Sequence, residues 1–364
     1  MFARSLSEKL HSLGIGSVLC FPALPSPPVA EFLKLPNVVI LSEPAVFDSR
    51  VQTASLAFLK LVAAHQPSVV HLHFMPFLSQ FPWLAKLRGT NKIFITDHSS
   101  LQENEVAVPV PGWKRALKLV IQKPVERVIT VSDFVLQTHL ALKHLPEERF
   151  QRIYNGVDLE RVRQAEALPS AEKFREKFGI PSDAVLISQV SWLIPQKGVA
   201  DLIAAAPQVI AACPKAHFCV AGEGPCLEEH LQAVADSGLM PHFTFTGQIA
   251  DPFFEGLFRA TDIVCQPSRW QEAFCWVLGE AMAFGLPIVA TRSGAIPELV
   301  TDGLTGFTTA CRDTDGIARS LITLCADPYL RSQMGKAARA EVQKRFSLEQ
   351  NTAEHLALYL SKPR

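Results

Sequence analysis

The sequence has no excess of charge of either sign and no clustered cysteines. Lys and Arg together number 35, and so do Asp and Glu, so the overall charge does not favour a nucleic-acid partner. None of the eight cysteines forms a Cys-x-x-Cys pair, which argues against a zinc site and against a disulfide framework. Most of them stand in apolar runs such as 217–220 and 262–267, so we expect buried thiols in a reducing compartment.

Long hydrophobic runs are absent as well. No apolar stretch reaches the roughly 18–20 residues that cross a bilayer. Residues 1–14 have the pattern of an amphipathic helix of mixed charge and lack the apolar segment of a signal peptide. We therefore expect a cytoplasmic location.

The 364 residues are 48% apolar and 19% charged, a composition that forms hydrophobic cores and is long enough for roughly two domains. Short β-branched runs alternate with longer amphipathic segments, which predicts βαβ units and parallel sheets. The runs that we expect to be strands are 17–23, 68–74, 92–98, 127–132, 185–191, 217–222, 242–247, 262–268 and 287–291.

A polar, charged segment at 156–183 predicts the connection between two Rossmann-like, doubly wound domains that face across a cleft. We place the first domain at 1–164 and the second at 165–345. We expect residues 346–364 to form a helix that packs back toward the first domain. In such sheets ligands bind beyond the carboxyl ends of the strands.

Two motifs follow predicted strands at such ends. Gly222 and Gly224 belong to a Gly-Glu-Gly-Pro turn that would let a ligand approach the backbone. Leu227 stands where a dinucleotide fingerprint needs a third glycine, so a plain tight turn is the alternative. Lys197, just before a helix, can reach a phosphate as a compact charge; the alternative is a solvated surface lysine.

The strongest candidate lies at 267–291. Glu272 precedes an apolar helix and Glu280 follows eight residues later; eight helical residues rise about 12 Å, which is the reach from a sugar across a diphosphate to a ribose. Between them, the backbone N–H groups of Phe274, Cys275 and Trp276 would form a helix N-terminus suited to a diphosphate. The alternative is two ordinary helix charges, but a partly buried Glu280 needs partners.

Three further patterns have modest interpretations. Gly294 and Glu298 follow the next predicted strand and are compatible with turn chemistry alone. His71 and His73 alternate along a strand and point to one face, where packing is favoured over metal binding. The segment 113–127 is basic and amphipathic, which fits either an anionic membrane surface or a solvated surface helix. Its basic residues are Lys114, Arg115, Lys118, Lys123 and Arg127.

These pieces occur in one order: Lys-Gly at 197–198, Gly-Glu-Gly-Pro at 222–225, Glu-x7-Glu-Ala-Met-Ala at 272–283 and Gly-x-x-Pro-Glu at 294–298. In that order and spacing they resemble the retaining glycosyltransferases of family 4, which have the GT-B fold. Segments 95–100, 128–135 and 153–158 resemble the N-terminal half of that family more loosely.

The resemblance implies that the first domain lies on the acceptor side and that the second binds a nucleotide sugar, and it implies a role for each site. Glu280 would hold the ribose, Glu272 the donor-sugar hydroxyls, and Lys197 with the backbone of 274–276 the diphosphate. His98 would reach the sugar from the N-terminal domain. Gly222 and Gly224 would contact the donor, and Phe245 and Gly247 would lie near the base.

The same resemblance implies that no metal and no cofactor besides a nucleotide-diphosphate sugar is needed. The acceptor would be a glycan, a lipid-linked or a small molecule, in polysaccharide or cell-envelope synthesis at the inner face of a membrane.

The chain departs from the family pattern in two places. Trp192 stands where the family commonly has a phosphate-binding arginine. The chain also starts inside the family's first helix, so we expect an N-terminal domain that lacks its first strand and interpret Met1 as an internal methionine of a longer chain. These departures favour, as an alternative, a truncated or non-catalytic relative. A dinucleotide oxidoreductase and a sugar-nucleotide epimerase fit the motifs less well.

Overall fold

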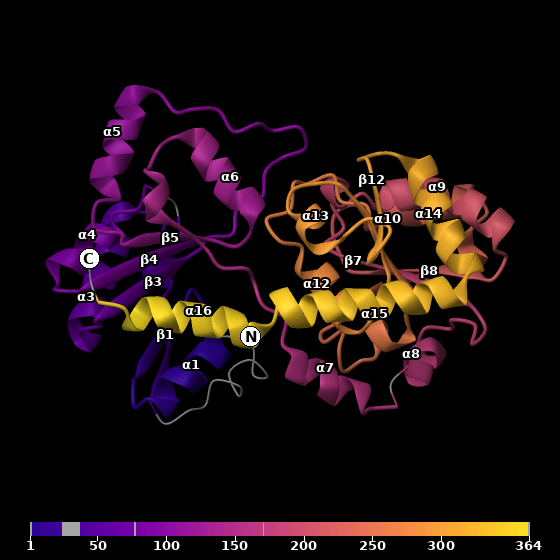
Figure 1. Cartoon of the computed structure of the whole chain (residues 1–364), viewed down its shortest axis with the longest axis horizontal. Coiled ribbons are helices and arrows are strands. Elements are labelled where there is room, and N and C mark those ends of the chain that lie inside the picture. Colours follow the sequence, from indigo (N-terminus) through magenta and orange to yellow (C-terminus); the bar gives the residue numbers. More distant parts are fainter. Residues whose placement is uncertain (1, 24–36, 76–77, 170, 363–364) are drawn as a thin grey trace. The chain divides into compact units, whose positions relative to one another are not determined.

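The computed structural model describes residues 2–23, 37–75, 78–169 and 171–362. Contacts within the chain divide it into two compact units. Unit 1 comprises Met1–Ser99, Val106–Gly156 and Leu348–Arg364, and unit 2 comprises Ser100–Glu105 and Val157–Ser347. Both are α/β structures built on parallel strands (Figure 1).

The strands of unit 1 form two separate sheets. One pairs β1 (Ser17–Phe21) with β2 (Val38–Ser42). The other has the order β3-β4-β5-β6, with the bounds β3 (Val69–His73), β4 (Lys92–Asp97), β5 (Arg127–Thr130) and β6 (Phe150–Arg152). Among the described residues, no strand of one sheet pairs with a strand of the other.

The helices of unit 1 include one from the far end of the chain. They are α1 (Phe2–Ser12), α3 (Val51–His65), α4 (Phe81–Leu87), α5 (Gly112–Ile121), α6 (Asp133–Leu142) and α16 (Leu348–Leu360), with the 3-10 turns η1 (Pro44–Phe47) and η2 (Glu147–Arg149). On α16, Thr352 is hydrogen-bonded to Ser5 at 2.8 Å, and the amide of Asn351 donates to the carbonyl of Tyr154. These buried polar contacts fix α16 on unit 1.

Unit 2 is a doubly wound sheet of six parallel strands in the order β12-β11-β10-β7-β8-β9. Its strands are β7 (Val185–Val190), β8 (Ala216–Ala221), β9 (Phe243–Gly247), β10 (Ile263–Gln266), β11 (Ile288–Thr291) and β12 (Gly306–Thr309). The chain runs outward from β7 to one edge, then returns to the other side of β7 as β10. Ligands of such sheets bind beyond the strand ends at this reversal.

Helices pack against this sheet, and every residue of β8 is buried. They are α7 (Leu159–Glu166), α8 (Ala171–Lys177), α9 (Val199–Ala212), α10 (Leu227–Asp236), α11 (Leu257–Ala260), α12 (Trp276–Ala283), α13 (Ile296–Leu299), α14 (Thr314–Ala326) and α15 (Pro328–Arg345), with the 3-10 turns η3 (Pro195–Lys197) and η4 (Met240–His242).

All nine predicted strands are present, each shifted by two residues or fewer at either end. The prediction missed the short strands β2, β6 and β12. The polar segment 156–183 is also more than a connection, because it forms α7 and α8, and Phe174 on α8 belongs to a hydrophobic core of unit 2. A few apolar residues in a charged stretch are enough to dock a helix.

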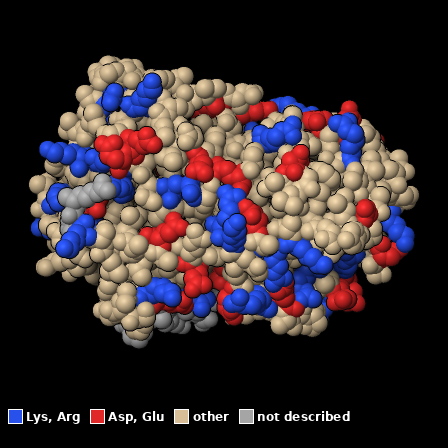
Figure 2. Space-filling view, in the orientation of Figure 1, with Lys and Arg blue, Asp and Glu red and all other residues tan. Residues whose placement is uncertain are grey.

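The surface carries charges of both signs (Figure 2), and most of the cysteines are buried. Figure 2 shows Lys and Arg interspersed with Asp and Glu over the visible face. All eight cysteines are free thiols; Cys219, Cys226, Cys265, Cys275 and Cys325 are buried. Within the described ranges, no helix combines the length and the apolar character that a bilayer span requires.

Candidate active site

Glu272 and Lys197 meet beyond the carboxyl ends of β10 and β7. Lys197 Nζ lies 2.7 Å from Glu272 Oε1, and the hydroxyl of Ser268 donates to the same oxygen at 2.8 Å. The Glu272 side chain is 9% exposed and that of Lys197 22%. The other oxygen, Oε2, accepts no hydrogen bond from any residue that the structure describes. The pair therefore keeps one carboxylate oxygen for a ligand hydroxyl.

Gly294 sets the backbone of Glu272. It has φ +57°, and a Cβ placed on it would lie 2.4 Å from both the nitrogen and the carbonyl oxygen of Glu272. The next residue, Ala295, donates its N–H to that carbonyl at 2.8 Å. Only glycine permits this approach, so the Gly-x-x-Pro-Glu turn helps to position the catalytic candidate Glu272.

An ion pair beneath the same loop holds it on α9. Arg269 makes two hydrogen bonds with Asp201, at 2.9 and 2.6 Å, and both side chains are largely buried. Such a bidentate pair fixes the direction of the loop as well as its distance from the helix. Neither residue was singled out in the sequence, because a pairing over 68 residues leaves no local pattern.

The helix between the two glutamates starts later than predicted. α12 begins at Trp276, and its N-cap Cys275 has left-handed backbone angles, φ +65° and ψ 73°. Glu272 therefore lies in the preceding loop, and a rise of eight helical residues does not describe its separation from Glu280. The backbone N–H groups of Phe274, Cys275 and Trp276 donate to no described residue, so the predicted anion-binding groups are open.

Glu280 lies on the first turns of α12 and is partly exposed. Burial raises the pKa of its carboxyl to about 7, although the positive charge of Arg161 opposes that rise. Arg161 itself is paired with Asp251. No described residue makes a hydrogen bond to the Glu280 carboxyl. A desolvated carboxyl without a partner in a protein is typical of a ligand site.

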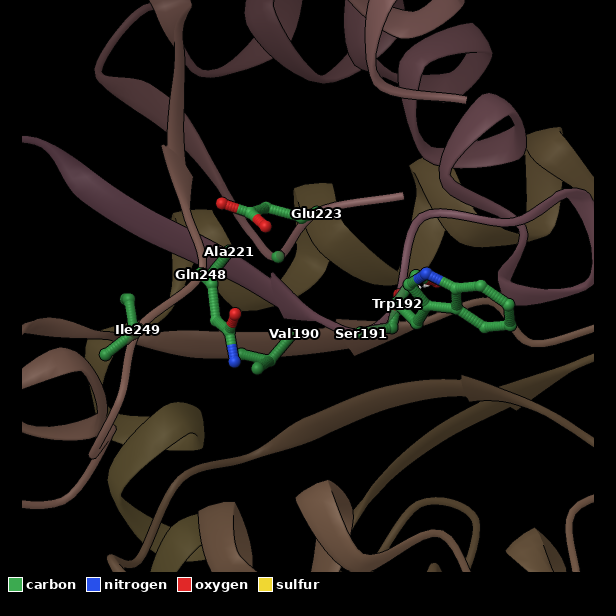
Figure 3. A pocket seen from close by; sticks show the side chains of 8 residues that line it. Val190, Ser191, Trp192, Ala221, Glu223, Gln248 and Ile249 are labelled. Atoms are coloured by element: carbon green, nitrogen blue, oxygen red, sulfur yellow. Dashed lines mark hydrogen bonds between the residues drawn. The ribbon is translucent and has the colours of Figure 1, made fainter. Parts of the chain in front are cut away.

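Gly222 and Gly224 have a clear packing role. A Cβ on Gly222 would lie 1.8 Å from the carbonyl oxygen of Ser191, and one on Gly224 would lie 2.4 Å from that of Leu193. Both glycines have φ near +150°, which other residues rarely adopt. The turn is thus pressed against the loop after β7, next to the exposed Trp192 (Figure 3).

Phe245 and Gly247, expected near a base, differ in position. Phe245 packs against the hydrophobic core of unit 2, so its ring serves the core. Gly247 ends β9, and its carbonyl accepts the N–H of Gly222 at 2.9 Å. The residue after it, Gln248, lines a cavity at the ends of β7 and β8.

His98 belongs to unit 1 and lies within a group of histidines. His73 Nδ1 is 3.2 Å from His98 Nε2, and the ring of Phe74 stacks on His98. Burial lowers the pKa of His98 to about 4, although the charge of Asp97 opposes that shift. His71 and His73 lie side by side, with ring centroids 4.1 Å apart, as their alternation along the strand predicts. Among the described residues, no group of three or more His, Cys, Asp or Glu has the arrangement of a metal site.

Segment 100–105, which follows His98 by two residues, is part of unit 2 and was missed by the sequence analysis. Leu101 and Gln271 form an antiparallel bridge with hydrogen bonds of 3.1 and 3.0 Å. The N–H of Ala273 donates to the hydroxyl of Ser100 at 3.1 Å. The segment therefore borders Glu272 on both sides. Contacts that span about 170 residues have no local sequence signal.

The basic segment 113–127 includes α5, on which no residue is buried. Trp113 is 67% exposed and Val120 61%. The indole N–H of Trp83 donates to the carbonyl of Val120 at 3.0 Å, which is a polar contact between α4 and the end of α5. The helix therefore presents apolar side chains beside its basic ones.

Two family models match the chain and together span nearly all of it. The model described as glycosyl transferases group 1 matches residues 170–341, and the model described as glycosyltransferase family 4 matches residues 1–161. The two matches divide the chain close to the boundary between its two units.

Curated relatives are similar over most of the chain. A GDP-mannose-dependent monoacylated alpha-(1-6)-phosphatidylinositol monomannoside mannosyltransferase of Corynebacterium glutamicum is 29% identical over 333 residues, with 88% of this chain and 81% of the relative covered. An N-acetyl-alpha-D-glucosaminyl L-malate synthase of Bacillus anthracis is 27% identical over 293 residues, with 80% and 74% covered.

Solved structures share the fold. A glycosyltransferase from Rickettsia africae has a TM-score of 0.84 at 20% identity, with 98% of this chain and 93% of that chain covered. Anabaena HepE in complex with UDP and glucose has a TM-score of 0.78 at 21% identity, with 99% and 94% covered. The chain is therefore a glycosyltransferase with the GT-B fold and belongs to the group 1 glycosyltransferases of family 4.

Proposed function

We propose that unit 2 binds a nucleoside-diphosphate sugar and that the enzyme transfers its sugar to an acceptor hydroxyl with retention of configuration. One observation carries this proposal: the carboxyl of Glu280 is desolvated and has no described partner, on the helix that follows the Glu272–Lys197 pair. Ribose hydroxyls are the donors that such a carboxyl lacks.

The remaining parts of the donor have matching groups. The sugar hydroxyls would donate to Oε2 of Glu272. The diphosphate would accept hydrogen bonds from the N–H groups of 274–276 at the start of α12, where the helix dipole favours negative charge. Gly222 and Gly224 would let the turn after β8 approach the donor, and Gly247 at the end of β9 would lie next to that turn.

Lys197 would act when the glycosidic bond to the diphosphate breaks. Negative charge then develops on the leaving oxygen, and an ammonium in a partly buried site stabilises that charge more than it stabilises the ground state. A lysine has three donors, so Lys197 can keep its contact with Glu272 and also reach a phosphate. No resident metal enters this scheme.

His98 in unit 1 would contribute a contact to the donor sugar. Its low pKa keeps the imidazole neutral at pH 7, so the ring can donate or accept one hydrogen bond. This assignment is what the family resemblance implies for unit 1. The acceptor would likewise depend on residues of unit 1.

The acceptor class that we propose is a glycan or lipid-linked molecule of the cell envelope. The Corynebacterium relative is named for a phosphatidylinositol-linked acceptor. On α5, exposed Trp113 and Val120 accompany basic residues, which suits the surface of an anionic membrane. We therefore propose a cytoplasmic enzyme that docks peripherally through 113–127.

Trp192 favours one alternative function. It is 63% exposed and cannot supply the cation that an arginine would bring to a diphosphate. A chain that binds the nucleotide and does not transfer the sugar would fit this departure. Measured turnover with a bound donor would exclude it.

Calorimetric titration with UDP, GDP and ADP tests the donor site. One nucleotide should bind saturably, and Glu280→Ala should weaken its binding at least about tenfold. Glu228→Ala, on the exposed face of α10, is the matched control and should bind normally. Transfer with the matching sugar nucleotides follows. A folded chain that binds no nucleotide, or an unaffected Glu280→Ala variant, would refute the proposed site.

A further inference from the structure

A cavity of about 370 Å³ opens at the carboxyl ends of β7 and β8 in unit 2. Its walls are mostly apolar, with the polar side chains of Ser191, Glu223 and Gln248 among them (Figure 3). The residues that matter here are Val190, Trp192, Ala221, Glu223, Gln248 and Ile249. A small apolar cavity with a few polar groups is typical of a site for a planar organic ligand.

Glu223 is held rigidly at this cavity. It stands between Gly222 and Gly224, which are both pressed against the loop after β7. Its own carbonyl accepts the N–H of Leu193 at 2.7 Å. Its side chain leans toward the end of β9, because Oε1 lies 3.7 Å from the place of a Cβ on Gly247. The backbone of Glu223 is therefore fixed beside the cavity, and its side chain is exposed.

Ser191 accepts a hydrogen bond from the amide of Gln189 at 2.7 Å, but the other two polar side chains of the cavity have no such partner in the part of the chain that the structure describes. Within the described residues, neither the carboxylate of Glu223 nor the amide of Gln248 makes a hydrogen bond. In the close-up, Gln248 and Ile249 lie on one side of the cavity and Trp192 on the other (Figure 3). Both side chains are exposed, so water solvates them in the free chain, and a ligand with complementary groups can replace that water.

The chemistry of a carboxylate discriminates between nucleotide bases. A carboxylate is an acceptor only. Guanine presents two adjacent donors, N1–H and the 2-amino group, which match both carboxylate oxygens. Uracil has a single N–H between two carbonyl oxygens, and adenine has an acceptor nitrogen next to its amino group, so each places an acceptor against the carboxylate.

We propose that Glu223 selects guanine, so that the donor is a GDP-sugar, with the amide of Gln248 as donor to a guanine acceptor atom. This inference rests on the proposed donor site and deepens it. The exposed indole of Trp192 adds an apolar wall on which a base or ribose can pack. Glu223 is then a specificity residue and takes no part in bond cleavage.

Calorimetric titration with GDP, IDP, UDP and ADP tests the assignment. IDP keeps N1–H and the carbonyl of guanine and lacks only the 2-amino group. The unaltered chain should bind GDP at least about tenfold more tightly than IDP, UDP or ADP. In Glu223→Gln the amide offers one donor and one acceptor. The ratio of the affinities for GDP and IDP should therefore fall to about unity, and the affinity for UDP should rise relative to that for GDP.

The control is Glu228→Gln, which removes the same charge from the exposed face of α10 and should leave all four affinities unchanged. Tighter binding of UDP or ADP than of GDP by the unaltered chain would overturn the inference, and so would a GDP-to-IDP ratio that Glu223→Gln does not change. If Glu280→Ala still weakens the nucleotide that does bind, the donor site stands and only the choice of base is wrong. Absence of binding to every nucleotide would overturn both proposals.

Discussion

Lys197 Nζ lies 2.7 Å from Oε1 of Glu272, across 75 residues of sequence. The two side chains leave the loops after β7 and β10, where the order of strands reverses. Each charge is partly withdrawn from water, so each stabilises the other. In the proposed mechanism, Lys197 stabilises the diphosphate that leaves, and Glu272 binds the sugar that is transferred.

Lys197→Met should lower both stability and activity. The variant leaves the carboxylate of Glu272 without its cation, which should cost about 2 kcal/mol of unfolding free energy, less than for a fully buried pair. Loss of transition-state stabilisation should lower kcat at least about 100-fold. Urea unfolding and steady-state transfer assays measure the two effects. Lys215→Met, which breaks a pair with Asp183 that is well exposed on both sides, should change neither.

Nucleotide binding should depend on pH through Glu280. Its folded pKa of about 7 lies above the ordinary value of 4.5, and ribose hydroxyls bind the ionised form as an acceptor. Affinity should therefore rise with pH and be about tenfold weaker near pH 6 than near pH 8. Glu280→Gln should flatten this part of the profile and leave only the ionisation of the phosphates. An unchanged slope would show that another group titrates.

The same shift has a consequence for folding. Because the folded pKa of Glu280 is raised, the native state prefers the protonated carboxyl, and stability is lost as the pH rises from 4.5 through about 7. Glu280→Gln should remove that loss and make the variant relatively more stable at pH 8 than at pH 5. Unfolding free energies of both chains at the two pH values measure it.

The buried histidines of unit 1 should make folding stability depend on pH in the opposite direction to Glu280. Burial lowers the pKa of His73 to about 3, and the pKa values of His98 and His355 to about 4. The unfolded chain takes up protons below about pH 6.5 that the native state resists, so stability should fall as the pH decreases from 6.5 toward 4. His355→Leu should reduce this dependence, as measured by urea unfolding at pH 7 and pH 5.

Gly222 offers a test of the packed turn. Gly222→Ala places a Cβ 1.8 Å from the carbonyl oxygen of Ser191, which should cost about 3 kcal/mol or distort the turn. Gly238→Ala is the matched control, since Gly238 also has positive φ but has nothing within 4 Å of a Cβ. Its cost should be about 1 kcal/mol. Equal costs would mean that the contact with Ser191 adds nothing to the cost of the positive φ.

Segment 100–105 should be held on unit 2 by Gln271. Its side-chain amide donates to the carbonyls of Gln102 and Glu105 at 2.7 and 2.8 Å. Gln271→Leu removes both bonds, so the amide of Leu101 should exchange with solvent faster than in the unaltered chain. Hydrogen exchange followed by mass spectrometry measures this. Exchange elsewhere in unit 2, for example in β8, should stay the same.

The sequence by itself determined the class of the fold and the order of its motifs. Alternating apolar runs predict parallel strands because helices must cover both faces of such a sheet, and nine runs became nine strands. The positions of Glu272 and Lys197 beyond strand ends, and of Glu280 on the helix that follows, come from the same pattern.

The tertiary structure decided what each of these residues touches. Only the folded chain shows that Lys197 is paired with Glu272, that Gly222 and Gly224 are needed for the approach of two loops, and that α12 begins at Trp276. It also brings segment 100–105 beside Gln271 and leaves the Glu280 carboxyl without a hydrogen-bond partner among the residues that the structure describes. The contacts among these join loops that are far apart in the sequence, whereas the left-handed backbone of Cys275 sets the start of α12. Periodicity reports which face of an element is apolar, and distances between elements arise only when those faces pack.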